Sequence, residues 1–191
     1  MKYIKFIFCL LIVLTNFLFS CNTKDNLAKN QNNSKEELKE LILQKEDSLM
    51  LLQKENVKIP IEKKYELIHT LLNYYDVFPN DKYSPVCLDK VHMSYSALGV
   101  YHNAVKYADI LIKKYPKYIN RPMILESQAS NYDIFLEPRD TAKVRYYYTL
   151  LLKENPTINK DKKDGILKRL KHLDLSFNEY IDFMMKEVSI K

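Results

Sequence analysis

The chain has 191 residues, and 30 Lys and Arg against 24 Asp and Glu give it a net charge of +6, spread along the sequence rather than clustered. Nucleic-acid binding needs a sustained basic patch, so the charge pattern argues against that class. With two glycines, Gly99 and Gly165, the chain has neither a glycine-rich phosphate loop nor a G-x-S-x-G nucleophile motif.

The chain begins with a short apolar segment behind two lysines. An almost unbroken apolar run over residues 6–19 is followed by the small residue Ser20 and by Cys21. This order is typical of a secretory signal. The run is too short for a membrane-spanning helix, which needs roughly 20 apolar residues. We therefore expect residues 1–20 to be a signal peptide.

The sequence Leu18-Phe19-Ser20-Cys21 resembles a lipobox, at which signal peptidase II cuts before a lipid-modified cysteine. Phe19 departs from the usual small or branched residue. The resemblance implies a diacylglycerol anchor on Cys21 in the outer membrane of a Gram-negative bacterium. An ordinary signal peptide with a cysteine near its cut is the alternative.

The polar, asparagine-rich residues after Cys21 cannot bury enough apolar surface to order themselves. We therefore expect residues 21–33 to form a lipidated flexible tether. It lacks the acidic cluster expected of lipoproteins exported to the cell surface in some bacteria. This favours the periplasmic face, and surface display stays open. With Cys9 in the signal and Cys21 lipidated, Cys87 has no disulfide partner and is expected to be a buried small apolar residue.

From Ser34 onward the pattern is helical throughout. Ser34-Lys35-Glu36-Glu37 is a capping box that predicts a helix start. Apolar residues then recur at helical spacing between prolines, of which Pro60, Pro85 and Pro122 stand where a first helical turn tolerates them. No segment has the period of a strand, so the expected fold class is all-α.

An internal repeat appears at an offset of 37 residues. Phe78-Pro79 aligns with Tyr115-Pro116, Pro85 with Pro122, Leu88 with Leu125 and Tyr95 with Tyr132. A further proline, Pro156, follows Pro116 after 40 residues, which predicts a three-residue insertion near residues 136–139. A period near 34 residues in a helical chain indicates stacked helix pairs.

The unit from Leu88 to Pro116 resembles a tetratricopeptide repeat (TPR). The residues that carry the resemblance are Leu88, Val91, Tyr95, Gly99-Val100-Tyr101, Ala104, Leu111 and Pro116. His92 departs from it, since a small residue is usual there. The second unit matches at Leu125, Ala129, Tyr132 and Pro156, with Val144 in place of the alanine. The resemblance implies that the tyrosines fill the gap within each pair and that Gly99 permits the turn.

Residues 34–191 are therefore expected to form a TPR-like right-handed solenoid of about three helix pairs with a C-terminal cap. The expected pairs span 34–78, 84–115 and 121–155, and the cap spans 160–188. Ser176 and Glu179 predict the capping box of the last helix. The chain is similar to TPR lipoproteins of Gram-negative bacteria, a group with the TPR subunit of the outer-membrane barrel-assembly machine and the Tol-Pal coordinator. Asp174 replaces a glycine that is usual in their final motif.

No catalytic or metal site is expected. The four histidines, His69, His92, His102 and His172, include no pair at i, i+4, and no H-E-x-x-H occurs. We expect His69 and His92 to be interior or boundary residues. A helix would point the three tyrosines of 146–148 in different directions, so packing is their expected role. No cofactor, small-molecule substrate or nucleic acid is expected.

The candidate site is the groove that the first helices of such pairs line, where protein partners of the cell envelope would bind. The repeat register places six residues there: Asp89, Met93, Ser96, Glu126, Ser130 and Asp133. The three acids would suit a cationic partner segment, and solvated helix positions without a role are the alternative. The function expected is a non-catalytic scaffold in envelope assembly or maintenance. An envelope enzyme or substrate-binding lipoprotein without a recognisable motif is the alternative function.

Overall fold

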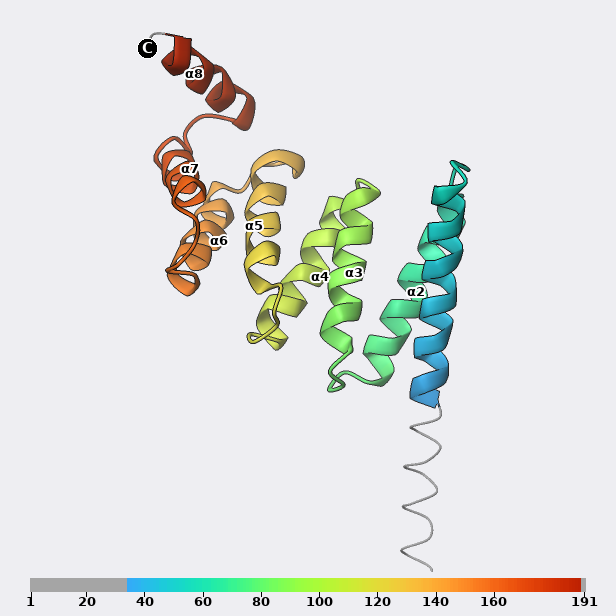
Figure 1. Ribbon diagram of the computed structural model, residues 1–191. Helices are drawn as coiled ribbons and strands as arrows, with labels where there is room; N and C mark the ends of the chain where they lie inside the picture. The colour runs from blue at the N-terminus through green and yellow to red at the C-terminus, as the bar shows by residue number, and fades with distance from the viewer. Residues whose placement is uncertain (1–33, 190–191) are drawn as a thin grey trace, which may run out of the picture. The chain divides into compact units, whose positions relative to one another are not determined.

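The computed structural model describes residues 34–189, and every regular element in that range is a helix (Figure 1). The expected all-α class is confirmed. The expected signal peptide, Cys21 and tether lie outside the described residues. The elements are a helix over 34–54, α2 (Ile61–Val77), α3 (Ser84–Ala97), α4 (Tyr101–Lys114), α5 (Arg121–Ser130), η1 (Asn131–Phe135), α6 (Thr141–Glu154), α7 (Lys160–Lys171) and α8 (Phe177–Ser189).

The chain divides into two compact units, and the boundary between Thr70 and Leu71 falls within α2. In the first unit, an ion pair of 3.1 Å between Lys45 Nζ and Glu66 Oε2 joins the helix over 34–54 to the start of α2. Ile42 and Ile68 are fully buried.

The second unit is built from antiparallel helix pairs. Helix α3 packs mainly against α4, and α5 with η1 packs against α6. Figure 1 shows α3 and α5 running in one direction and α4 and α6 in the other. The helix boundaries coincide with the pairs expected over 84–115 and 121–155. Helix α5 and η1 together occupy the positions that α3 occupies in the preceding pair.

The turn between α3 and α4 depends on Gly99. Its φ of 73° lies in the left-handed region, where a side chain is disfavoured. The Val100 amide donates to the Tyr95 carbonyl at 2.9 Å and the Gly99 amide to the Ser96 carbonyl at 3.0 Å. This is the Schellman ending of a helix, and it lets α4 fold back on α3.

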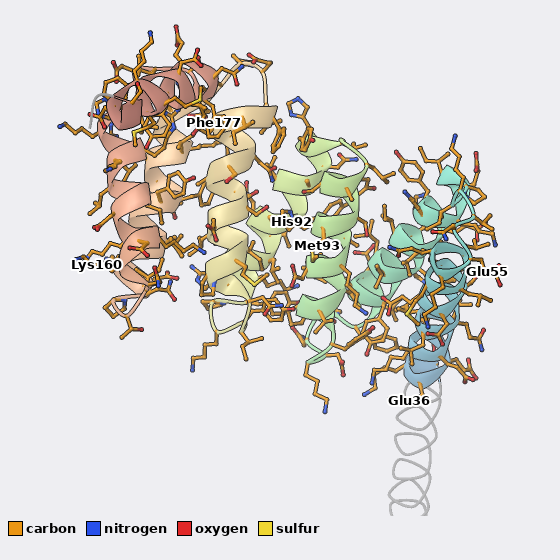
Figure 2. All side chains as sticks on the ribbon, turned by 45° about the horizontal axis from the view of Figure 1, so that its top comes forward. Glu36, Glu55, His92, Met93, Lys160 and Phe177 are labelled. Carbon is orange, nitrogen blue, oxygen red and sulfur yellow. The ribbon has the colours of Figure 1, made fainter. Side chains whose placement is uncertain are left out.

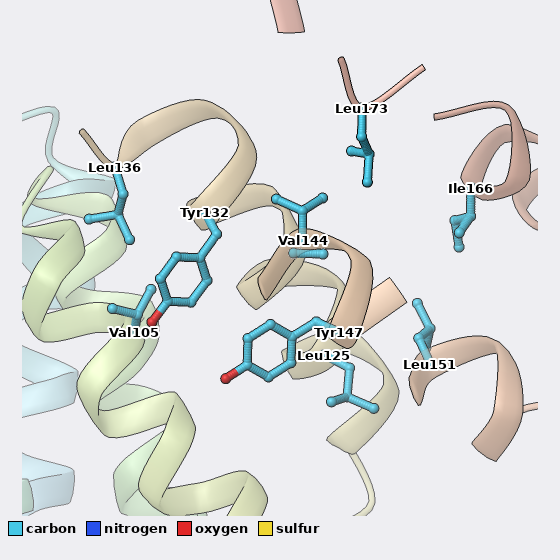
Figure 3. Close-up of a cluster of buried hydrophobic side chains, with 10 residues drawn as sticks. Val105, Leu125, Tyr132, Leu136, Val144, Tyr147, Leu151, Ile166 and Leu173 are labelled. Atoms are coloured by element: carbon cyan, nitrogen blue, oxygen red, sulfur yellow. The ribbon is translucent and has the colours of Figure 1, made fainter. Parts of the chain in front are cut away.

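The main apolar core of the second unit lies where α4, α5, η1, α6 and α7 meet (Figure 3). Its buried members are Val105, Leu125, Ala129, Tyr132, Leu136, Val144, Tyr147, Leu151, Ile166 and Leu173. A second cluster joins α3, α4 and α5 through Leu88, Ala108, Leu111 and Ile124. The repeat positions Leu88, Leu125, Ala104 and Val144 are all fully buried, as the register predicts.

The last helix begins with the predicted capping box. The Ser176 amide donates to Glu179 Oε2 at 2.8 Å, and the Glu179 amide donates to Ser176 Oγ at 3.3 Å. The hydrogen bond from the Ser176 hydroxyl is the main reason that the pKa of Glu179 is lowered. The start of α8 is therefore encoded locally by these two residues.

Candidate partner-binding surface

The six residues expected in the groove lie on two helical segments that run in the same direction. Asp89, Met93 and Ser96 are on α3, and Glu126, Ser130 and Asp133 are on α5 and η1. The structure does not make them one exposed surface, because their burial differs sharply.

Asp89 is a buried structural residue, which corrects the expectation that it faces a groove. Only 7% of it is exposed. Its Oδ2 accepts hydrogen bonds from the Tyr118 hydroxyl and from the side-chain amide Nδ2 of Asn120, both at 3.0 Å. Burial first, and then the Asp89 charge, raise the pKa of Tyr118. The carboxylate therefore fastens the loop between α4 and α5 onto α3.

Asp133 is also buried, with 5% exposed, and this corrects its expected place on the groove surface. Arg169 donates to both of its oxygens, at 2.7 and 2.8 Å, and Arg139 Nε donates to Oδ1 at 2.8 Å. The two guanidinium groups also donate to the carbonyls of His172, Leu173 and Leu175. This cluster fastens η1 to the segment between α7 and α8.

Glu126 is half-buried and forms an ion pair with helix α7. Lys162 Nζ of α7 lies 2.6 Å from Glu126 Oε2. Glu126 is equivalent to Asp89 in the repeat register. Each of the two acids binds residues that come after its own helix pair in sequence: Asp89 binds Tyr118 and Asn120, and Glu126 binds Lys162. The expected row of three free acids for a cationic partner is therefore not present.

The uncharged groove candidates differ in the same way. Met93 is 57% exposed on α3, whereas its neighbour His92 faces the interior (Figure 2). Ser130 is half-buried and shares a hydrogen bond with Tyr148. The Ser96 hydroxyl oxygen is buried, and among the described residues it has no hydrogen-bond partner.

Two exposed apolar residues were missed from the sequence. Met123 on α5 is 62% exposed, and Ile119 in the loop before α5 is 85% exposed. An apolar residue in a periodic helical pattern is assigned to the core by default. One sequence signal could have shown that Met123 is exposed. It lies two residues before Leu125, the buried repeat position of α5, and residues two apart in a helix point in different directions.

Cys87 and His92 are both buried, so neither is accessible as a nucleophile or a base. His92 is 3% exposed, and its Nδ1 lies 3.1 Å from the Ala104 carbonyl oxygen. Burial is the main cause of its lowered pKa. Cys87 is fully buried, as predicted. His69 is exposed, so its expected interior or boundary position was wrong.

The described residues contain no group of three His, Cys, Asp or Glu side chains that could hold a metal ion. Within the same residues, no helix combines the length and apolarity that crossing a membrane requires. The tyrosines of 146–148 point in different directions, as predicted: Tyr147 is buried, Tyr148 half-buried and Tyr146 exposed.

Comparisons with protein-family descriptions, with curated proteins and with solved structures find no match to this chain.

Proposed function

We propose that the protein is a lipid-anchored, periplasmic scaffold of the outer membrane, built from TPR-like helix pairs and acting through protein–protein contacts. The observation that carries the proposal is the recurrence of one packing unit. Tyr95 stacks on Tyr107 in the pair α3–α4, and Tyr132 stacks on Tyr147 in the next pair. Repeated pairs of this kind present their first helices as a binding surface.

Exposed methionines support an apolar partner segment rather than the cationic one expected from the sequence. Met93 on α3 and Met123 on α5 are each more than half exposed. Methionine side chains are flexible and polarizable, and they adapt to the surface of a bound helix or peptide. The partner that fits is an envelope protein with an amphipathic segment.

The burial of His92 disfavours one form of the enzyme alternative, in which this histidine is the catalytic base. A substrate could reach this residue only if α3 and α4 separated, because its ring lies between them and bonds to Ala104. A catalytic base must come within hydrogen-bond reach of its substrate.

Site-specific photo-crosslinking in intact envelopes tests the scaffold. A photoreactive residue at position 93 or 123 should give discrete adducts with a partner protein. The matched control is position 146 on α6, because Tyr146 is 57% exposed, the same fraction as Met93. Equal adducts at all three positions, or none, would contradict the assignment of this surface.

The anchor is tested separately by mass spectrometry. The wild-type chain should carry the mass of a diacylglycerol on Cys21, and Cys21→Ser should release the protein from membranes. Stable anchoring needs two acyl chains or more, and the variant would have none. Unchanged retention of an unlipidated chain would contradict the anchor without bearing on the crosslinks.

A further inference from the structure

The loop between α4 and α5, residues 115–120, displays an apolar tip. Ile119 is more exposed, at 85%, than any other large apolar residue that the structure describes. Exposing an isoleucine to water is unfavourable, and a chain normally turns such a residue inward where its backbone permits.

Contacts on both sides of Ile119 hold the loop in place. Tyr118 and Asn120 both donate to the buried Asp89 at 3.0 Å. Earlier in the loop, the Tyr115 hydroxyl donates to the Pro79 carbonyl at 2.5 Å. Because both neighbours of Ile119 are fixed to the same carboxylate, its side chain cannot turn inward without breaking those hydrogen bonds.

Basic residues stand in the loop and in the last turn of α4 before it, and this stretch of sequence contains no acid. Lys113, Lys114 and Lys117 are exposed, and residues 110–120 contain no Asp or Glu. The surface that complements this loop is therefore anionic.

A shallow apolar pocket of about 350 Å³ lies beside the tip. Its lining consists of Pro85, Tyr115, Pro116, Lys117, Tyr118 and Ile119. Apart from the lysine, these residues present aromatic and aliphatic surface, so the pocket has room for part of an acyl chain next to Ile119.

We infer that the loop over 115–120 is a membrane-contact site for an anionic lipid bilayer. Ile119 enters the acyl-chain boundary, Tyr115 and Tyr118 lie at the depth of the headgroups, and the lysines attract anionic headgroups. A protruding tip suits a fluid surface, whereas a bound peptide needs an extended groove. The inference rests on the proposed lipid anchor, which would keep this weak contact close to a membrane.

The absence of tryptophan from the sequence allows a direct test. The full chain with Ile119→Trp is reconstituted with phosphatidylcholine vesicles that contain or lack phosphatidylglycerol. Its emission should shift to the blue and be quenched by brominated acyl chains when phosphatidylglycerol is present. Tyr146→Trp, at an exposed position on α6, is the matched control and should remain solvent-like.

A charge variant tests the electrostatic part. Lys113→Gln with Lys117→Gln, in the Ile119→Trp chain, should weaken quenching in the anionic vesicles, and added salt should do the same. A second comparison uses the lipidated chain with Cys87→Ser and a dye attached at Lys117→Cys. Adding Ile119→Asp to this labelled chain should reduce the fraction of loops inserted by about tenfold or more, measured by bromolipid quenching of the dye.

A solvent-like tryptophan at position 119 in both vesicle types would overturn the inference. So would protection of position 119 that appears only when envelope proteins are added, since that result assigns the loop to a protein partner. These outcomes are separable from failure of the proposed function, because the lipid mass on Cys21 and the crosslinks at positions 93 and 123 are independent of the loop.

Discussion

Tyr132 in η1 and Tyr147 in α6 stack with their ring centroids 5.9 Å apart and their planes inclined by 10°. Tyr95 and Tyr107 make the same contact in the preceding pair, at 5.7 Å and 5°. The first tyrosines of the two contacts are 37 residues apart in sequence and the second tyrosines are 40 apart. Two of the three extra residues lie in the turn after η1, which spans 136–140 where the earlier turn spans 98–100, and the third lies within α5 and η1. The stacked tyrosine contact is kept in spite of this insertion.

The stacked tyrosines should contribute strongly to stability. Truncating Tyr95 or Tyr132 to alanine removes a buried ring and leaves a cavity, and we expect each variant to lose about 3 to 5 kcal/mol of unfolding free energy in urea titrations. Tyr146→Ala, in the same helix as Tyr147 but exposed, should lose less than about 1 kcal/mol. Equal losses at the three positions would mean that the tyrosine register is wrong.

The buried cluster around Asp133 should be sensitive to loss of its single acid. Asp133→Ala leaves the guanidinium groups of Arg139 and Arg169 without their carboxylate, and removing one partner of a buried ion pair costs about 3 to 5 kcal/mol. Glu126→Ala breaks a partly exposed pair with Lys162 and should cost no more than about 1 kcal/mol. Chemical unfolding of the two variants makes the comparison, and a similar loss in both would contradict the assigned burial.

Because Asp89 and Asp133 are buried, charge reversal at the groove candidates tests stability rather than partner binding. Reversing Asp89, Glu126 and Asp133 together to lysine would place new cations beside buried donors, so the variant should unfold rather than only lose binding. Circular dichroism would show this as a large drop in melting temperature. A fully stable triple variant would restore the original expectation of an exposed acidic surface.

His92 should make stability depend on pH. Its pKa is lowered in the folded protein from the ordinary value of 6.5, chiefly by burial. As pH falls below 6.5, the unfolded chain binds a proton that the folded chain does not, so stability decreases toward the folded pKa. His92→Gln should flatten the fall in melting temperature between about pH 7 and pH 5.

Replacing glycine by alanine should lower the stability at Gly99 and raise it at Gly165. A methyl group added at Gly99 or Gly165 would meet no other atom within 4 Å, so crowding does not distinguish them. Gly99→Ala should cost about 1 to 2 kcal/mol because of its positive φ. Gly165→Ala should add roughly 0.5 to 1 kcal/mol, since alanine is the better residue inside helix α7. Thermal unfolding of both variants measures the two stability changes. Stability changes of the same sign would contradict the assigned turn at Gly99.

Features that depend on a few neighbouring residues could be predicted from the sequence. The capping box at Ser176 and Glu179 followed from a spacing within one helical turn. The turn at Gly99 and the burial of Tyr95 and Tyr132 were implied by the resemblance to the tetratricopeptide repeat. Such patterns set hydrogen bonding and helix faces locally. The helix pairs over 84–115 and 121–155 were predicted from the internal repeat at an offset of 37 residues, with nearly the observed boundaries.

The burial of the acids was decided by the tertiary structure alone. Helical spacing places Asp89 on the same face of α3 as Met93, and the repeat register makes Asp133 equivalent to Ser96. Neither pattern shows which later residues cover these positions. Asp89 is covered from a loop about thirty residues further along, and Asp133 by Arg169, 36 residues away. Whether a carboxylate at a given helical position is exposed or buried depends on which later segment of the chain packs over it. A charged group that becomes buried must be paired with a partner of opposite charge or with hydrogen-bond donors.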